Sequence, residues 1–267
     1  MKTSRLLRRW QRRQGRLLAE LQQGVRHGQL TGDASQIHAL RVTLRRLRLL
    51  LRVGRPFYDK SALKAFRRWA TKIANATSRI RDLDVALEWL AGKPDSAALL
   101  ELGQIRRERL WRAARPRMRP LTMDVLAGLA DSPQGRRNAE RLARRVARGE
   151  ARFRAQIAAE LPRFFELDEE GRHQFRRRLR WWRYLRELAR PRRKREKDAL
   201  LPHLIGAQEA IGDLQNRLVT ELHLKHLRAT PALGGIRRLL DGEREVATQR
   251  IREALQALTQ LGLDRPE

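Results

Sequence analysis

Arginine recurs at helical spacing along two stretches of the chain. The first stretch places cationic side chains three and four residues apart, at His38, Arg41, Arg45, Arg48, Arg52 and Arg55. The second repeats the pattern 135 residues later, at His173, Arg176, Arg180 and Arg183. Steps of three and four residues keep side chains on one face of a helix. Each stretch therefore predicts a helix with one face occupied by positive charge, which favours a long polyanion as its partner.

Other residues recur at nearly the same offset. Apolar residues beside the first stripe have counterparts beside the second, the first set being Leu40, Leu44 and Leu47 and the second Phe175, Leu179 and Trp182. Upstream, a run of five arginines recurs 136 residues later, Arg5, Arg8, Arg9, Arg12 and Arg16 returning as Arg141, Arg144, Arg145, Arg148 and Arg152. A constant offset indicates a duplicated unit. We expect two halves, residues 1–131 and 132–267.

Helical periodicity runs almost throughout the chain, and strand signals are nearly missing, which predicts an all-α fold. We expect helices near residues 3–27, 33–54, 60–91, 96–130, 136–160, 169–190, 195–227 and 234–261. Each half then has four helices, long enough to pack as an antiparallel bundle.

Local signals refine these boundaries. Pro116 and Pro120 should break the fourth helix, because proline removes a backbone donor and clashes with the preceding turn. Asp33 and Gln36 are spaced as a capping box for the second helix. The segment 131–135, rich in turn residues, predicts the joint between the halves.

The charge balance indicates the class of partner. Among 267 residues, 60 are basic and 30 acidic, so the net charge is +30, and 52 of the basic residues are arginine. Arginine stays charged and binds phosphate oxygens in pairs. Such a balance implies nucleic acid, an acidic membrane surface or polyphosphate as the partner. The chain has no cysteine, and no stretch approaches the roughly 18 apolar residues of a membrane span, so we expect a soluble cytoplasmic protein.

The segment from Ile37 to Arg48, with its histidine and arginine stripe, resembles the signature of the CHAD family, the conserved-histidine α-helical domain. Arg81-Asp82-Leu83-Asp84-Val85 is similar to the second marker of that family, and Gly212-Asp213-Leu214 is its counterpart in the other half. The resemblance covers nearly the whole chain. It implies two four-helix bundles related by a pseudo-twofold axis around a basic central cavity, which together make one domain. It also implies binding of inorganic polyphosphate, and in some bacterial members targeting to polyphosphate granules.

The second half departs from the first at several positions. Trp181 stands where the first copy has Arg46, and Gln215 stands where the first copy has Asp84. The third helix also carries more basic residues than its counterpart in the second half. We therefore expect the second half to bind the polyanion more weakly, unless the basic cluster 192–197 compensates.

Catalytic chemistry has little support in the sequence. No nucleophile accompanies His38 or His173, so each could donate a hydrogen bond to phosphate or fix a neighbouring helix, and both interpretations stay open. His223 and His226 could hold a metal, although a solvated helix end is the simpler explanation. The carboxylates of Asp82, Asp84 and Asp213 could bind Mg²⁺, but we favour a structural role in which they hold cationic side chains. We expect no enzyme activity, no cofactor and no metal.

We expect non-covalent binding of inorganic polyphosphate, with nucleic acid as the alternative partner and a polyphosphate-metabolising enzyme as a further possible one. Weak binding of nucleic acid through charge alone is compatible with binding of polyphosphate. The expected binding residues on the two central helices are His38, Arg41, Arg45, Arg48, Arg52, His173, Arg176, Arg180 and Arg183. A second wall is expected from Arg5, Arg9, Arg12, Arg141, Arg145 and Arg148. Further contacts are expected from Lys64, Arg68, Lys72 and Lys197.

Overall fold

The computed structural model describes residues 2–130, 135–225 and 231–263, and these residues form helices and no strand. The α-helices are α1 (Lys2–Leu30), α2 (Ala34–Val53), α3 (Lys60–Leu90), α4 (Ala97–Ala114), α5 (Met123–Ala130), α6 (Arg136–Glu160), α7 (Glu169–Ala189), α8 (Arg192–Glu196), α9 (Leu200–Lys225) and α10 (Pro231–Gln260). Short 3-10 helices are η1 (Arg55–Phe57), η2 (Arg115–Arg117) and η3 (Leu161–Glu166). The predicted all-α class is confirmed.

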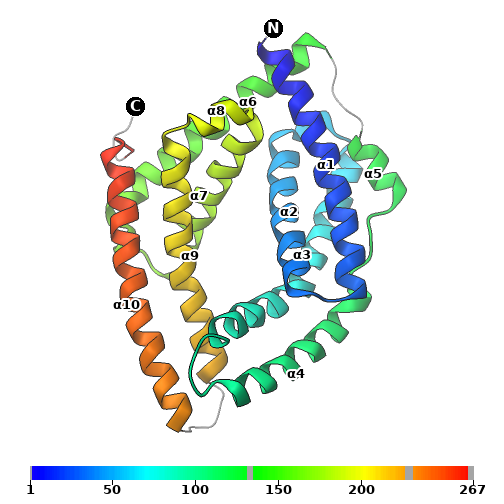
Figure 1. Ribbon diagram of the computed structural model, residues 1–267. Coiled ribbons are helices and arrows are strands. Elements are labelled where there is room, and N and C mark those ends of the chain that lie inside the picture. Colours follow the sequence, from blue (N-terminus) through cyan, green and yellow to red (C-terminus); the bar gives the residue numbers. More distant parts are fainter. Residues whose placement is uncertain (1, 131–134, 226–230, 264–267) are drawn as a thin grey trace.

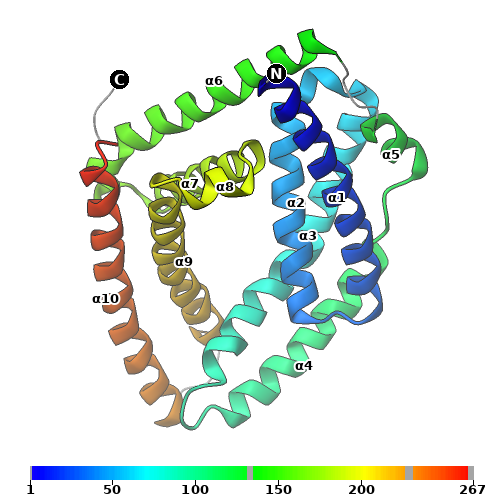
Figure 2. The same cartoon turned by 45° about the horizontal axis from the view of Figure 1, so that its top comes forward.

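The long helices form two sides that meet along their inner helices. Helices α1, α2 and α3 lie on one side and α9 and α10 on the other, while α6 crosses one end of the molecule and α4 runs along the opposite end (Figures 1 and 2). Between the sides, α2 packs against α7 and α3 packs against α9. Helix α6 also contacts α1. The two arginine-striped helices, α2 and α7, are therefore direct neighbours.

Aspartate side chains fix the start of the central helices. The Asp33 carboxylate accepts a 3.0 Å hydrogen bond from the Gln36 backbone N–H, and Asp168 accepts one of 2.7 Å from Gly171. These bonds satisfy backbone donors that the first helical turn leaves without a partner. The predicted capping box is only half formed, because the Asp33 backbone N–H donates to the Thr31 hydroxyl at 3.3 Å.

Prolines account for two helix boundaries. The predicted break at Pro116 and Pro120 is confirmed, since α4 ends at Ala114 and α5 begins at Met123. The helix predicted over 195–227 is instead divided into α8 and α9, which begins at Leu200. Pro202 lies in the first turn of α9, where its missing N–H needs no helical acceptor. A helix continuing through Pro202 would place the proline ring against the carbonyl of Asp198, which explains the correction.

The apolar stripes predicted for the central helices are buried. Leu40, Leu44 and Leu47 are at most 2% exposed, and so are Phe175, Leu179 and Trp182. The first core cluster joins α1, α2 and α3 to residues of α6 and α7, which are Ala139, Leu142, Val146, Tyr184, Leu185 and Leu188.

The proposed boundary between residues 131 and 132 lies in a segment, 131–134, that falls outside the described residues. The first core cluster nevertheless contains residues from both sides of this boundary, because helices of both predicted halves contribute side chains to it. The division into two halves and the duplication behind it stay predictions.

Candidate anion-binding site

The arginine stripes of α2 and α7 face each other across the contact between these helices. The positive charge of Arg45 on α2 lowers the pKa of both Arg176 and Arg180 on α7. An influence of this kind requires proximity, because water screens charge over short distances. We call Arg41, Arg45, Arg48, Arg176 and Arg180 the arginine cluster.

Burial makes the charge of this cluster unfavourable. It is the largest cause that lowers the pKa of Arg41 and of Arg176 to about 10 and that of Arg180 to about 9. Neighbouring guanidinium groups lower these pKa values further, Arg45 acting on all three residues. Both effects disfavour the charged form. A bound anion would relieve the repulsion and replace the lost water.

Helices α3 and α9 hold two members of the cluster in place. Arg41 Nη1 donates to the Ala74 carbonyl at 2.8 Å and to the Thr77 hydroxyl at 2.9 Å. Arg176 Nη1 donates to the Gln215 side-chain oxygen on α9. Close approach of Arg176 to α9 depends on Gly212, where an added Cβ would lie 2.7 Å from Arg176 Nη2. These two arginines are therefore fixed before any ligand arrives.

Two members of the cluster keep their donors unoccupied. Within the described part of the chain, Arg45 and Arg180 make no hydrogen bond and no ion pair with any side chain or carbonyl. Arg48 has only a 3.3 Å bond to the Thr71 hydroxyl. A guanidinium group carries five N–H donors, so Arg45 and Arg180 have donors available for an anion.

Arg183 was predicted to line the same site, but it is engaged elsewhere. Its Nε donates to Glu187 at 2.8 Å, and its Nη1 donates to Gln208 at 3.4 Å. Glu187 also pairs with Arg46 at 3.3 Å. The charge of Arg183 is therefore compensated within the protein, unlike that of Arg45 and Arg180.

The two motif histidines lie at the outer ends of the stripes and are exposed. His38 lines a hollow together with Arg81 and Arg107, and His173 Nδ1 lies 3.4 Å from the Gln215 amide nitrogen. Partial burial is the main cause that lowers the pKa of both histidines below 6.5, aided by Arg81 at His38 and by Arg180 at His173. Both rings are consequently neutral near pH 7.

The acidic residues of the family markers differ in their surroundings. Asp84 is buried and pairs with Arg107 Nε at 2.5 Å, a contact in keeping with a carboxylate that holds a cationic side chain. Asp213 lies 3.8 Å from Arg217. The Asp82 carboxyl has its pKa raised by burial, although nearby Arg41 acts in the opposite direction. Among the described residues, no three His, Asp or Glu side chains gather in a way that could hold a metal; His226 lies outside them.

Two of the arginines predicted for a second wall bind the ends of the central helices. Arg9 donates to the Ala189 carbonyl at 2.6 Å, at the C-terminus of α7. Arg145 donates to the Val53 carbonyl at 2.5 Å, at the C-terminus of α2. The two donors, Arg9 and Arg145, are 136 residues apart in the sequence, and so are the two acceptors, Val53 and Ala189. A cation at a helix C-terminus satisfies free carbonyls and interacts favourably with the helix dipole.

The remaining predicted residues do not gather at one place. Arg5, Arg9 and Lys197 line a hollow of about 940 Å³ beside α8, whereas Arg52, Arg145 and Arg148 line another of about 350 Å³ between α2, α6 and α7. The other five are exposed on α1, α3 and α6 and line neither hollow, these being Arg12, Lys64, Arg68, Lys72 and Arg141.

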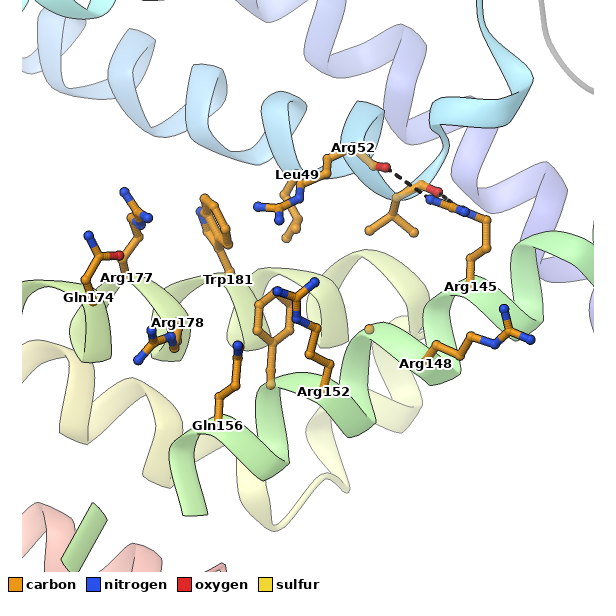
Figure 3. A pocket seen from close by; sticks show the side chains of 13 residues that line it. Leu49, Arg52, Arg145, Arg148, Arg152, Gln156, Gln174, Arg177, Arg178 and Trp181 are labelled. Carbon is orange, nitrogen blue, oxygen red and sulfur yellow. Dashed lines mark hydrogen bonds between the residues drawn. The ribbon is translucent and has the colours of Figure 1, made fainter. Parts of the chain in front are cut away.

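Several residues near these sites were not among the predicted binding residues. Arg13 donates to the Glu187 and Arg190 carbonyls, and Arg81 acts on the charge of the cluster. Arg152, Arg177 and Trp181 line the hollow beside α6 (Figure 3). Arg177 and Trp181 are four residues apart, each following a stripe residue by one position, so a search for a second face of α7 would have found them.

One family model matches most of the chain. The family model described as the CHAD domain matches residues 8–225. A search of curated proteins finds no match. The crystal structure of the CHAD domain from the plant Ricinus communis has a TM-score of 0.66 at 20% identity, covering 94% of this chain and 92% of that one. PptA from Streptomyces chartreusis has a TM-score of 0.49 at 18% identity, covering 93% and 98%. No helix in the described ranges is long and apolar enough to cross a membrane.

Proposed function

The chain belongs to the CHAD family, and from this premise we propose that it binds inorganic polyphosphate through the arginine cluster without chemical change. The observation that carries the proposal is the pair Arg45 and Arg180. Both are half-buried, both have their pKa lowered by burial, and neither has a partner among the described residues. Phosphate oxygens match guanidinium donors in charge and geometry.

The shape of the cationic surface favours a linear polymer over a small anion. The α2 stripe from His38 to Arg52 spans 14 residue steps, or about 21 Å at 1.5 Å per residue. A short phosphate oligomer can touch only part of such a stripe, whereas a longer chain gains contacts without a second cost of association. We therefore expect long polyphosphate to bind much more tightly than pyrophosphate.

Nucleic acid is the second candidate, favoured by the net charge of +30. Duplex DNA is wide and stiff, and it should reach arginines between two packed helices poorly. Aromatic residues make up 5% of the chain, which offers little surface for stacking bases. Granule residence and docking of a polyphosphate-metabolising enzyme are compatible with the proposal and belong to it as expectations.

A competition experiment tests the proposal. Labelled long polyphosphate is bound to the protein at moderate salt and displaced with pyrophosphate, unlabelled long polyphosphate or duplex DNA at matched phosphate concentration. We expect long polyphosphate to displace the label at the lowest concentration. Displacement by DNA at an equal or lower concentration would favour the nucleic-acid function instead.

A double variant locates the binding. Arg45→Gln with Arg180→Gln should lower the affinity for polyphosphate by at least about tenfold, since each lost charge-assisted hydrogen bond contributes roughly 1.5–3 kcal/mol. Arg137→Gln with Arg144→Gln is the matched control, because both residues are exposed on the outer helix α6 and line neither hollow. An equal loss in the control would mean that only total charge matters.

A further inference from the structure

The hollow between α2, α6 and α7 is strongly cationic and contains no acidic side chain. Thirteen residues line it, six of them arginines and none of them aspartate or glutamate. Figure 3 shows Arg52 reaching in from α2, Arg152 from α6, and Arg177 with Trp181 from α7. We call this hollow, of about 350 Å³, the α6 groove.

Trp181 separates two of these arginines. The guanidinium carbon of Arg52 lies 4.8 Å from the Trp181 ring centre, and that of Arg177 lies 5.2 Å from it. In Figure 3 the indole stands between the two side chains. Phe153 supports the indole edge-on, at a centroid distance of 6.2 Å. Stacking of this kind attracts cations to the ring and fixes the planar guanidinium groups, so two like charges are held close together.

Most donors in the groove are unoccupied. Arg145 is bound to the Val53 carbonyl, and Arg178 is paired with Glu160. By contrast, the guanidinium groups of Arg52, Arg148, Arg152 and Arg177 have no hydrogen bond or ion pair to any part of the chain that the structure describes. Four sets of donors therefore border a space that the protein lines with no carboxylate.

The corresponding end of the other predicted half is neutralised. At the 135-residue offset, Glu187 corresponds to Arg52, and Arg46 corresponds to Trp181. There Glu187 pairs with Arg46 at 3.3 Å and with Arg183 at 2.8 Å. The cationic surface is therefore asymmetric, with available donors beside α6 and compensated charge at the related position.

A second hollow connects the α6 groove to the arginine cluster. It has a volume of about 480 Å³, lies between α2 and α3, and contains Arg48 of the cluster together with Arg67. It shares Leu49, Arg52 and Trp181 with the α6 groove. Available cations thus continue from the cluster, past the Arg52–Trp181 stack, onto α6.

We propose that the α6 groove is a second anion site, which binds phosphate groups of the same condensed-phosphate chain that the arginine cluster holds. The inference rests on the proposed function and adds a direction to it. The bound chain leaves the cluster on the α6 side, where donors are available, and not at the end closed by Glu187. A chain too short to span both sites gains nothing from the groove.

Two variants on α6 test this inference by titration with tripolyphosphate and with long polyphosphate. Arg148→Gln with Arg152→Gln should weaken binding of the long chain by at least about tenfold, because each lost charge-assisted hydrogen bond contributes roughly 1.5–3 kcal/mol. Binding of tripolyphosphate should change by less than about twofold, because its groups fit within the cluster. The control is again Arg137→Gln with Arg144→Gln, on the same helix but outside the groove.

The outcomes separate this inference from the proposed function. If the wild-type protein binds neither tripolyphosphate nor long polyphosphate, both the proposed function and the α6 groove inference are wrong. Wild-type binding that the groove variant leaves unchanged for the long chain, or that it weakens equally for both chains, overturns the groove alone. A loss in the Arg137 and Arg144 control as large as in the groove variant also overturns it.

Trp181 offers an independent optical test. Phosphate that binds Arg52 or Arg177 must change the stacking of that guanidinium group on the indole, so long polyphosphate should alter the tryptophan emission of the wild-type protein. Trp181→Phe keeps an aromatic ring between the arginines but removes this indole from the six tryptophans of the chain. Most of the emission change should vanish in that variant. An undiminished change would place the ligand away from the groove.

Discussion

Substitution of Arg180 by glutamine should make the ligand-free protein more stable. Burial and neighbouring arginines lower the pKa of Arg180 from its ordinary value to about 9. At about 1.4 kcal/mol for each tenfold change in proton binding, keeping this residue charged costs up to ~5 kcal/mol. Salt, and water that reaches the cluster, reduce the repulsion, so we expect Arg180→Gln to recover about 1–2 kcal/mol of the free energy of unfolding. For a chain of this size that raises Tm by roughly 2–8 °C.

The pH dependence identifies the cause of this gain. Below about pH 9, Arg180 is protonated in both the folded and the unfolded chain, so its unfavourable charge is fully present at pH 7. As the pH rises above 9, the folded chain releases this proton before the unfolded chain does, and the penalty disappears. Thermal melts monitored by circular dichroism should therefore show a Tm advantage for Arg180→Gln that is full at pH 7 and smaller at pH 10.

Arg183, one turn further along α7, is the matched control. It carries the same side chain on the same helix but pairs with Glu187 at 2.8 Å. Because Arg183→Gln leaves a mostly buried carboxylate with one partner fewer, Tm should fall in this variant. If Arg180→Gln melts below the wild type at pH 7, or if both variants shift in the same direction, Arg180 is structural and the repulsion argument fails.

Four further outcomes are expected. Affinity for polyphosphate should fall steeply with salt, because binding releases counterions; a flat titration between low and physiological salt would exclude the electrostatic mechanism. Affinity for polyphosphate should rise as the pH falls below about 6.5, since protonation of His38 and His173 adds positive charge near the ligand. The stability of the free protein should fall over the same pH range, because the folded chain takes up these protons less readily than the unfolded chain. The double variant His38→Gln with His173→Gln should flatten both pH curves. Leu44→Ala should cost about 2–5 kcal/mol in urea unfolding, because the side chain is 2% exposed. Gly32→Ala should also destabilise the fold, because Gly32 has a φ of +65° and an added Cβ would lie 2.4 Å from Trp111; an unchanged Tm would contradict this.

The sequence predicts the helices well because their period depends on local residues. Leu40 and Leu44 lie beside the cationic stripe in the sequence pattern, and both are buried. The same period places Arg41, Arg45 and Arg180 on the faces where α2 and α7 meet. Such patterns need no knowledge of which helices are neighbours.

The use of each arginine could not be predicted, because it depends on tertiary contacts. Arg9 and Arg12 belong to the same predicted face of α1, yet Arg9 donates to the end of α7 while Arg12 is exposed. Arg52 and Trp181 come from opposite halves of the sequence and meet only after α2 packs against α7. Whether a guanidinium group is occupied or available is decided by these long-range partners and not by its spacing.

The exchanged bonds at the helix ends bear on how the chain folds. Arg9 completes the end of α7, Arg145 completes the end of α2, and one core takes residues from α1, α2, α6 and α7. A chain of half this length would leave a helix end open and part of that core in water. Two such chains would have to associate, so that the arginine of each chain binds the helix C-terminus of the other. In the 267-residue chain the same dependence should appear as cooperativity, with both sides lost in a single unfolding transition.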